Sequence, residues 1–333
     1  MDKNIKVAII GAGNMGEHRA RSYSNAKNID LVAVSDINEK KGKNLADKFG
    51  CCFFNNYNKM FSEKKIDIVV VSVPTKLHKK ICLDVISNNK DLIVEKPFAS
   101  NSKEAKEIVN AAENAGIKLS VSHIERFNPA IKKLKKDIQA GKFGKITSII
   151  VRRVGIFPPH FISDSDVIMG LVIHDIDILN YLLDNKQPCS VFAKGAKIFA
   201  DSGIDSAEIF LSYGDISVFI QANWITPGKF RKISITGTEA YAELNCLTQE
   251  LEFYKVNPSR KINSFTEFIK YGQPVKKQIK IKKTEPMPFE IKFFMESIKY
   301  NKKIEVMGED GLKSIIIAEK AKESLKFNKL IKI

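Results

Sequence analysis

The sequence predicts an α/β protein of two domains: a doubly wound parallel sheet, followed by an α/β domain with a large open, mainly antiparallel sheet. In the first third, short apolar runs alternate with helical patterns. Between about 189 and 254, β-rich segments follow one another with no helical pattern between them. The chain has 333 residues, whereas a single core seldom grows past about 250–300 residues. We therefore expect domains at 1–122 and 123–333.

Five apolar runs predict the strands of the first sheet. The middle run, IDIVVVSVP, consists mostly of β-branched residues, as is typical of a strand buried on both faces. The predicted strands cover 5–10, 31–36, 66–74, 92–97 and 118–123. Helical patterns begin at about Asn14 and cover 38–49 and 102–116. This βαβ alternation predicts a doubly wound parallel sheet.

The second domain begins with a helix from about 128 to 140, a strand at 146–154 and the helix VIMGLVIHDIDIL at 167–179. The β-rich segments that follow predict one antiparallel sheet, whose second face needs a cover. We expect a second subunit there, in a homodimer or homotetramer. KKQIKIKK at 276–283 is typical of a charge-protected edge strand, and helices are expected at about 288–300 and 309–327.

Composition limits the class of protein. No apolar run approaches the roughly 18–20 residues that span a bilayer, and the N-terminus enters a strand pattern directly, so we expect a soluble cytoplasmic protein. The five cysteines show no metal-binding spacing and are expected to be reduced thiols. The net charge is +16, but the lysines are spread along the chain. This favours an anionic small substrate over nucleic acid, and no membrane partner is expected.

GAGNMG predicts a dinucleotide site. It follows a strand, opens a helix and contains Gly11, Gly13 and Gly16 in the GxGxxG spacing of the Rossmann fold. Gly11 permits the tight turn, Gly13 the approach of a pyrophosphate, and Gly16 close helix packing. Asp36, at the end of the next strand, would accept hydrogen bonds from the adenosine ribose and repel a 2′-phosphate. NAD is therefore the expected cofactor.

LIVEKPFA places Lys96 at the carboxyl end of a buried strand, where open α/β sheets bind ligands. Partial desolvation makes the proton of such a lysine easier to remove. Lys96 could therefore hydrogen-bond a substrate hydroxyl and take part in acid–base chemistry. Pro97 is expected to fix the turn that orients it.

GAGNMG, Asp36, VPTKLH (73–78), EKP (95–97) and HDIDIL (174–179), in this order, resemble the Gfo/Idh/MocA oxidoreductases. The resemblance covers essentially the whole chain. It implies a Rossmann domain, an oligomer-forming α/β domain and oxidation of a secondary alcohol of a sugar or cyclitol by NAD(P). It also implies that Lys96 and His174 are the catalytic residues, with Glu95 in support. The cofactor contacts we expect are Gly11, Gly13, Asn14, Met15, Gly16, Asp36, Pro74, Thr75, His78, Glu95 and Lys96.

HIERFNPAIKKL, RRVGIFPPH and DVIMGLVIHDID look like the branch of this family that acts on nucleotide-linked N-acetyl amino sugars such as UDP-N-acetylglucosamine. This resemblance implies oxidation at C3 to a 3-keto sugar. Besides His174, the expected contacts with the sugar or pyrophosphate are Arg126, Asn128, Arg152 and Arg153. For each of the last two, a solvent-facing position on the strand is an equally good interpretation.

On an α-helix Gly170, His174 and Asp177 share one face, and we expect Asp177 to support His174. Many relatives have an aspartate at the position of Gly170. Either Lys96 and His174 suffice, with Asp164 or Asp166 supplying a carboxylate, or the redox step is weakened or lost. Which of Lys96 and His174 is the base stays open.

Three alternatives compete with a sugar-nucleotide dehydrogenase. The first is an inositol or free-sugar dehydrogenase of the same fold, which needs no phosphate clamp. The second is a sensor that binds NAD and a sugar nucleotide without turnover. The third, a basic nucleic-acid binder, would require the lysines to gather on one face.

Overall fold

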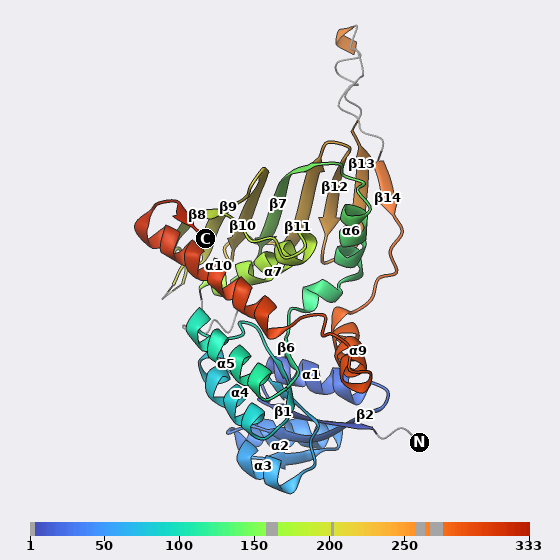
Figure 1. Cartoon of the computed structure of the whole chain (residues 1–333), viewed down its shortest axis with the longest axis vertical. Helices are drawn as coiled ribbons and strands as arrows, with labels where there is room; N and C mark the ends of the chain where they lie inside the picture. The colour runs from blue at the N-terminus through green and yellow to red at the C-terminus, as the bar shows by residue number, and fades with distance from the viewer. Residues whose placement is uncertain (1–3, 158–165, 201–202, 257–263, 267–275) are drawn as a thin grey trace. The chain divides into compact units, whose positions relative to one another are not determined.

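The computed structural model describes residues 4–157, 166–200, 203–256, 264–266 and 276–333. Two compact units make up the chain (Figure 1). Unit 1 comprises Met1–Ile124 and Glu285–Ile316, and unit 2 comprises Glu125–Thr284 and Ile317–Ile333. The chain thus passes from the first unit to the second, returns, and ends in the second.

Unit 1 is built on a six-stranded sheet of order β3-β2-β1-β4-β5-β6. All its neighbouring strands are parallel, which confirms the doubly wound fold. The central strand β4 has no exposed residue, as its β-branched run predicts. The strands are β1 (Ile5–Ile10), β2 (Ile29–Ser35), β3 (Cys52–Phe54), β4 (Ile68–Val71), β5 (Asp91–Val94) and β6 (Leu119–Val121).

The helices of unit 1 begin and end at residues suited to those places. In α2 the side chain of Asn38 accepts a hydrogen bond from the amide of Lys41, and Gly50 ends the helix in the left-handed conformation. The side chains of Asn56 and Asn101 likewise cap the helices that begin at Tyr57 and Ser102. The elements between the strands are α1 (Asn14–Ser24), α2 (Glu39–Phe49), α3 (Tyr57–Glu63), η1 (Thr75–Leu77), α4 (His78–Ser87) and α5 (Ser102–Asn114).

The segment 285–316 folds with unit 1, whereas the expected boundary assigned it to the second domain. Its helix α9 (Pro286–Lys299) carries Met287, Ile291 and Phe294 on one apolar face. These side chains are buried in the same core as Val7 and Ile68 of the parallel sheet. Burying that face is the physical reason for the return of the chain.

Unit 2 is built on a nine-stranded sheet of order β14-β13-β12-β11-β7-β10-β9-β8-β15. Only β7 and β10 pair in parallel, so the expected mainly antiparallel sheet is confirmed. The basic strand β14 lies at an edge, as expected. The strands are β7 (Ile146–Val154), β8 (Ser190–Ala196), β9 (Ser206–Tyr213), β10 (Ile216–Asn223), β11 (Phe230–Gly237), β12 (Ala240–Asn245), β13 (Glu250–Lys255), β14 (Lys276–Ile279) and β15 (Ile331–Lys332).

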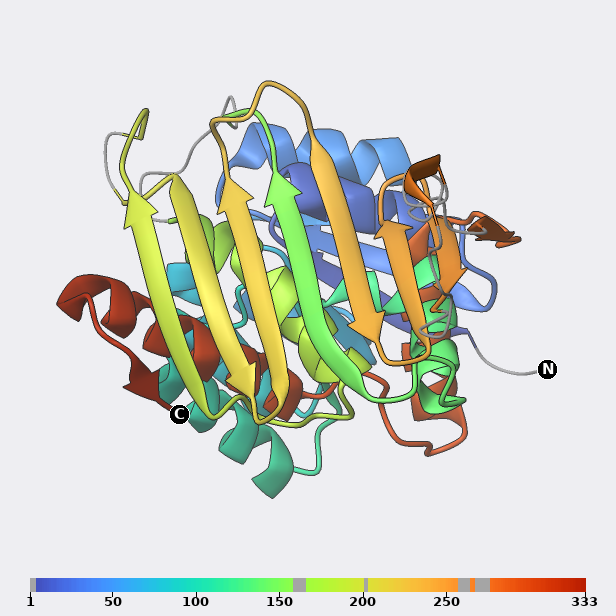
Figure 2. The ribbon, with the colours of Figure 1, turned by 90° about the horizontal axis from the view of Figure 1, so that it is seen from above.

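Helices cover one face of this sheet, and the other face is open in Figure 2. The covered face carries the core, which joins Ile149 and Val151 of β7 to Ile176 and Leu179 of the helix after it. The helical elements are η2 (Ile124–Phe127), α6 (Pro129–Gln139), the π-helical turn η3 (Ile168–Val172), α7 (Ile173–Leu182) and α10 (Gly308–Phe327), whose last part belongs to unit 2.

The open face of the sheet carries a transverse apolar row. Phe192, Phe210, Phe219 and Ile150 are successive cross-strand partners on β8, β9, β10 and β7. Phe210 is 54% exposed and Ile150 50% exposed. Large apolar side chains in contiguous register are unusual on a surface that meets only water.

All five cysteines are free thiols, as expected. In the parts of the chain that the structure describes, no helix is both long and apolar enough to cross a bilayer.

Candidate functional site

The three glycines of GAGNMG differ in what surrounds them. Gly11 has φ +106°, and a Cβ there would lie 2.4 Å from the carbonyl oxygen of Ser72. A Cβ on Gly16 would lie 1.9 Å from the carbonyl oxygen of Gly11. A Cβ on Gly13 would meet no protein atom within 4 Å. The first and third glycines therefore serve the fold, and the open side of Gly13 can admit a pyrophosphate.

The N-terminus of α1 suits an anion for a second reason. Gly13 is its N-cap, and a glycine offers no side chain to cap the first-turn amides. Asn14 and Met15, in the first turn, are exposed. These amides and the helix dipole are the groups that would hold the phosphates of a dinucleotide.

Asp36 lies at the carboxyl end of β2, next to the glycine turn. Its Oδ2 accepts a hydrogen bond of 2.6 Å from the amide of Ala12, and its Oδ1 accepts one of 2.7 Å from the amide of Asn38. Each carboxylate oxygen keeps a further lone pair for a ribose hydroxyl. The residue directly after Asp36 is Ile37, which is 93% exposed. Its side chain carries no charge that could hold a 2′-phosphate.

His78 is buried at the start of α4, after Pro74 and Thr75 of η1. Its Nε2 lies 2.9 Å from the carbonyl oxygen of Val73, and its Nδ1 lies 3.0 Å from that of Pro97. Burial lowers the pKa of the imidazole. The ring thus joins the turn after β4 to the EKP turn.

The EKP turn is fixed by a buried ion network. Arg19 of α1 is fully buried, and its Nε donates a hydrogen bond of 2.7 Å to Oε1 of Glu95. The same guanidinium pairs with Glu290 of α9 and donates to Oγ of Ser122 after β6. Burial opposes its charge, but Glu290 and Glu95 outweigh burial and raise the pKa of Arg19. Glu95 is therefore held in place, and the half-buried Lys96 comes directly after it.

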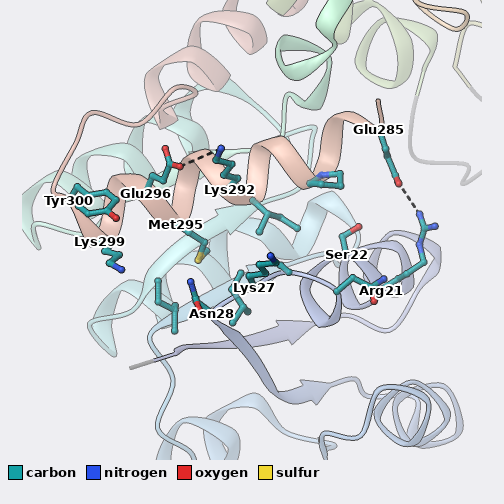
Figure 3. Close-up of a pocket in the computed structure, with 16 residues that line it drawn as sticks. Arg21, Ser22, Lys27, Asn28, Glu285, Lys292, Met295, Glu296, Lys299 and Tyr300 are labelled. Atoms are coloured by element: carbon teal, nitrogen blue, oxygen red, sulfur yellow. Dashed lines mark hydrogen bonds and ion pairs between the residues drawn. The ribbon is translucent and has the colours of Figure 1, made fainter. Parts of the chain in front are cut away.

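A cavity of about 540 Å³ lies elsewhere on unit 1 (Figure 3). It is lined by the last residues of α1, by α9, and by Ile5 and Ile29 at the amino ends of β1 and β2. The glycine turn and Lys96 follow the carboxyl ends of their strands. The cavity is therefore separate from the expected dinucleotide site.

In unit 2 the helix that carries His174 is not uniform. Gly170 lies in the π-helical turn η3, and its amide donates to the carbonyl oxygen of Asp166 at 2.8 Å. His174 is half-buried in the first turn of α7. The face that Gly170, His174 and Asp177 were expected to share assumes a regular α-helix, and the π-helical turn interrupts that helix at Gly170. Single π turns inside helices are frequent at functional sites.

Two buried aspartates of α7 bind arginines. Asp177 accepts hydrogen bonds from Nε and Nη2 of Arg126, the shortest of 2.7 Å. Asp175 accepts a bond of 2.6 Å from Nε of Arg153 on β7. The sequence suggested Asp177 as a partner of His174 and left Asp175 open. The structure brings each of them to an arginine that was expected to contact the substrate.

The expected substrate-contact residues therefore have different surroundings. Arg126 and Arg153 are buried in these ion pairs. Asn128 is also buried, and it caps α6 by accepting from the amide of Ala130. Arg152 is on the opposite face of β7 from Arg153, exposed, with its guanidinium 5.5 Å from the centre of the Phe230 ring.

Asp166 is one of the two carboxylates considered as substitutes for an aspartate at position 170. It accepts a hydrogen bond from the amide of Met169 and pairs with Lys322 at 2.7 Å. Asp164, the other one, and His160 lie outside the described residues. His18 is exposed on α1, and His123 is buried after β6.

Arg231 and Lys229 were not singled out from the sequence. Arg231 lies on β11 directly opposite Arg153 of β7. Lys229 precedes β11, and a Cβ on Gly155 would lie 3.8 Å from its Cα. Only strand register could reveal this group of cations, because its members are far apart in the sequence.

A glycine turn open at Gly13, with Asp36 at the next strand and a lysine after β5, defines an NAD-binding oxidoreductase. The chain belongs to the Gfo/Idh/MocA oxidoreductase family. Residues 5–123 match the model described as "Oxidoreductase family, NAD-binding Rossmann fold", and residues 131–243 match the GFO/IDH/MocA C-terminal domain. The expected family and NAD are confirmed.

Curated relatives include two kinds of dehydrogenase. The chain is 28% identical over 252 residues to UDP-N-acetylglucosamine 3-dehydrogenase of Acidithiobacillus ferrooxidans, covering 75% of this chain and 77% of that one. It is 24% identical over 340 residues to inositol 2-dehydrogenase of Rhizobium meliloti, covering 99% of both. A solved structure of the Acidithiobacillus enzyme has a TM-score of 0.85 at 23% identity, over 98% of this chain and 99% of that one.

Replacing Arg19 by methionine should lower the free energy of unfolding by about 3–5 kcal/mol, because two buried carboxylates lose their counter-ion. Urea unfolding followed by circular dichroism would measure it. Arg21→Met is the matched control, since Arg21 pairs with Glu285 where both side chains are 51% exposed. That change should cost about 0–1 kcal/mol. Equal losses in the two variants would contradict the role given to Arg19.

Gly13→Ala and Gly16→Ala should separate cofactor binding from folding. Gly13 has φ −78°, which alanine adopts freely, so the melting temperature should stay unchanged. Its methyl group would obstruct the pyrophosphate and weaken NADH binding about tenfold or more, which is 1.4 kcal/mol or more. Gly16→Ala should instead lower the melting temperature, because its methyl group would overlap backbone. Isothermal titration and thermal melts test both, and unchanged NADH affinity in Gly13→Ala would refute the assignment.

Proposed function

We propose that this protein oxidises the C3 hydroxyl of a nucleotide-linked N-acetyl amino sugar, such as UDP-N-acetylglucosamine, to the 3-keto sugar with NAD⁺. The observation that carries the reaction type is Lys96. It follows a buried strand of an NAD-binding fold, and the Arg19–Glu95 pair holds its turn. The similarity to the Acidithiobacillus enzyme over three quarters of both chains supports the sugar nucleotide.

The proposed chemistry assigns one task to each residue. NAD⁺, when bound, supplies the hydride acceptor. Lys96 donates a hydrogen bond to the substrate oxygen, which stabilises the negative charge that develops there. His174 accepts the hydroxyl proton as general base. The two roles could also be exchanged, with Lys96 as the base and His174 as the hydrogen-bond partner. The pH–rate profiles of variants at the two residues would distinguish these mechanisms.

A second candidate is an inositol dehydrogenase, which the full-length similarity to the Rhizobium enzyme favours. A neutral cyclitol needs no cation beyond the catalytic lysine. A substrate panel separates the candidates: UDP-N-acetylglucosamine, its 6-carboxylate and myo-inositol, each with NAD⁺. Formation of NADH with myo-inositol and with neither UDP-sugar would refute the sugar-nucleotide proposal. Binding of UDP-sugars without turnover of any substrate would instead favour the sensor.

Lys96→Met and His174→Gln should each lower kcat by about 10²–10⁴-fold on the true substrate, because the first removes the hydrogen bond to the developing negative charge and the second removes the group that accepts the proton. Affinity for the UDP-sugar, measured by titration calorimetry, should change much less. Steady-state NADH formation measures the rates. A variant that keeps more than a third of the wild-type kcat would remove that residue from the proposed chemistry.

We further propose a cytoplasmic homo-oligomer that assembles through the open face of the nine-stranded sheet. The support for assembly is the apolar row of Phe192, Phe210, Phe219 and Ile150, which a second copy of the chain would bury. The support for the cytoplasm is the set of five free thiols.

Phe210→Asp should reduce the oligomer to a smaller species, because it places a charge in the centre of the apolar row. Light scattering coupled to size-exclusion chromatography measures the mass. Leu247→Asp is the control, since Leu247 is 45% exposed in the turn between β12 and β13. A monomeric wild-type protein, or an unchanged mass for Phe210→Asp, would contradict assembly through this face.

A further inference from the structure

Three cations gather where β7 and β10 end and β11 begins. Arg153 and Arg231 are direct cross-strand partners, so both side chains leave the sheet on its helix-covered face. Lys229 lies two residues before Arg231 in the turn that follows β10. We call Arg153, Arg231 and Lys229 the cation cluster. All three belong to unit 2.

Among the described residues, carboxylates make contact with only one of these three cations. Arg153 binds Asp175 at 2.6 Å and pairs with Glu125 at 3.4 Å. Among the described residues Arg231 makes no side-chain hydrogen bond or ion pair, and its buried Nη1 has no partner. Lys229 is exposed and likewise has no ion pair within the described chain.

Unpaired charge in this position is unfavourable. Like charges directly opposite one another on neighbouring strands destabilise a sheet, and a buried donor without an acceptor adds a cost of its own. Burial and the neighbouring Arg153 lower the pKa of Arg231, and the carboxylates of Glu125 and Asp175 oppose this only in part. Arg231, followed by burial and Arg153, lowers the pKa of Lys229. An oxyanion from outside the protein would offset the repulsion between these cations and could accept a hydrogen bond from Nη1 of Arg231.

We propose that Arg231 and Lys229 bind an anionic group of the substrate, either a phosphate or a carboxylate. The planar guanidinium can form two parallel hydrogen bonds with either group, and the ammonium of Lys229 adds a mobile charge. Asp175 and Glu125 contribute by fixing the side chain of Arg153. This inference rests on the proposed function and extends it: Arg126 and Arg153 are engaged in internal pairs, so Arg231 and Lys229 take the task of anion recognition.

The two sources of such a group are the diphosphate of a UDP-sugar and the 6-carboxylate of a hexuronate. Titration calorimetry with UDP, UDP-N-acetylglucosamine and its 6-carboxylate separates them. Arg231→Met and Lys229→Gln are the test variants. Lys232→Gln is the matched control, because Lys232 neighbours Arg231 on β11 but leaves the sheet on the opposite face.

If the diphosphate is bound here, both test variants should weaken all three ligands about tenfold or more. If the carboxylate is bound here, only the 6-carboxylate should weaken, and UDP should bind as before. Lys232→Gln should leave every affinity within twofold. The affinity of the wild-type protein should also fall with added salt, and less steeply in the variants.

Thermal melts exclude a merely structural role. Because Arg231 opposes Arg153 without a counter-ion, Arg231→Met should keep or raise the melting temperature while it weakens binding. A lower melting temperature with unchanged affinities would overturn the inference, as would affinities within twofold for both variants. If the wild type turns over UDP-sugars and both variants keep the wild-type KM, the inference is overturned and the proposed function stays intact. Anion binding that the variants weaken, without turnover in the wild type, would overturn the function alone.

Discussion

The buried guanidinium of Arg19 is the constraint on which unit 1 depends. A charge with no exposed surface must be surrounded by acceptors, and these come from three distant places in the chain. Glu95 arrives with the end of β5, Ser122 with the end of β6, and Glu290 with α9. The network therefore couples the position of the EKP turn to the return of 285–316 into the first unit. The apolar face of α9 supplies the favourable burial, and Arg19 gives the contact its specificity.

In unit 2, buried arginine–carboxylate pairs likewise orient α7. Asp175 and Asp177 are two residues apart, so their side chains leave the helix about 200° apart, at about 100° per residue. One binds Arg153 on β7 and the other binds Arg126 in η2, so the helix is held from both sides. His174 comes directly before this pair. Its helix is thereby fixed in rotation, which the proposed role of His174 as a base for one particular hydroxyl requires.

Because these aspartates occupy Arg126 and Arg153, we assign recognition of the anionic group of the proposed substrate to other cations. Arg231 and Lys229 lie at the same edge of the sheet and have no carboxylate of their own in the described chain. The sheet thus divides its tasks between two faces. On the helix-covered face lie the buried ion pairs and α7 with His174. The open face carries the apolar row and the exposed Arg152.

The sequence by itself determined what depends on neighbours along the chain. Gly11 and Gly16 could be assigned their roles in the fold from spacing, because a turn between strand and helix is a local structure. Strand alternation likewise predicted both sheets and the basic edge strand, but it left open which arginine of the pair at 152 and 153 is exposed. Tertiary structure alone decided the partners of buried charges. Asp177 meets Arg126, Asp175 meets Arg153, and Arg231 faces Arg153 only through strand register. Tertiary structure alone also decided the π turn at Gly170 and the return of α9, since both depend on packing between segments far apart in the sequence. Local propensity carries no information about which distant side chain will neutralise a charge.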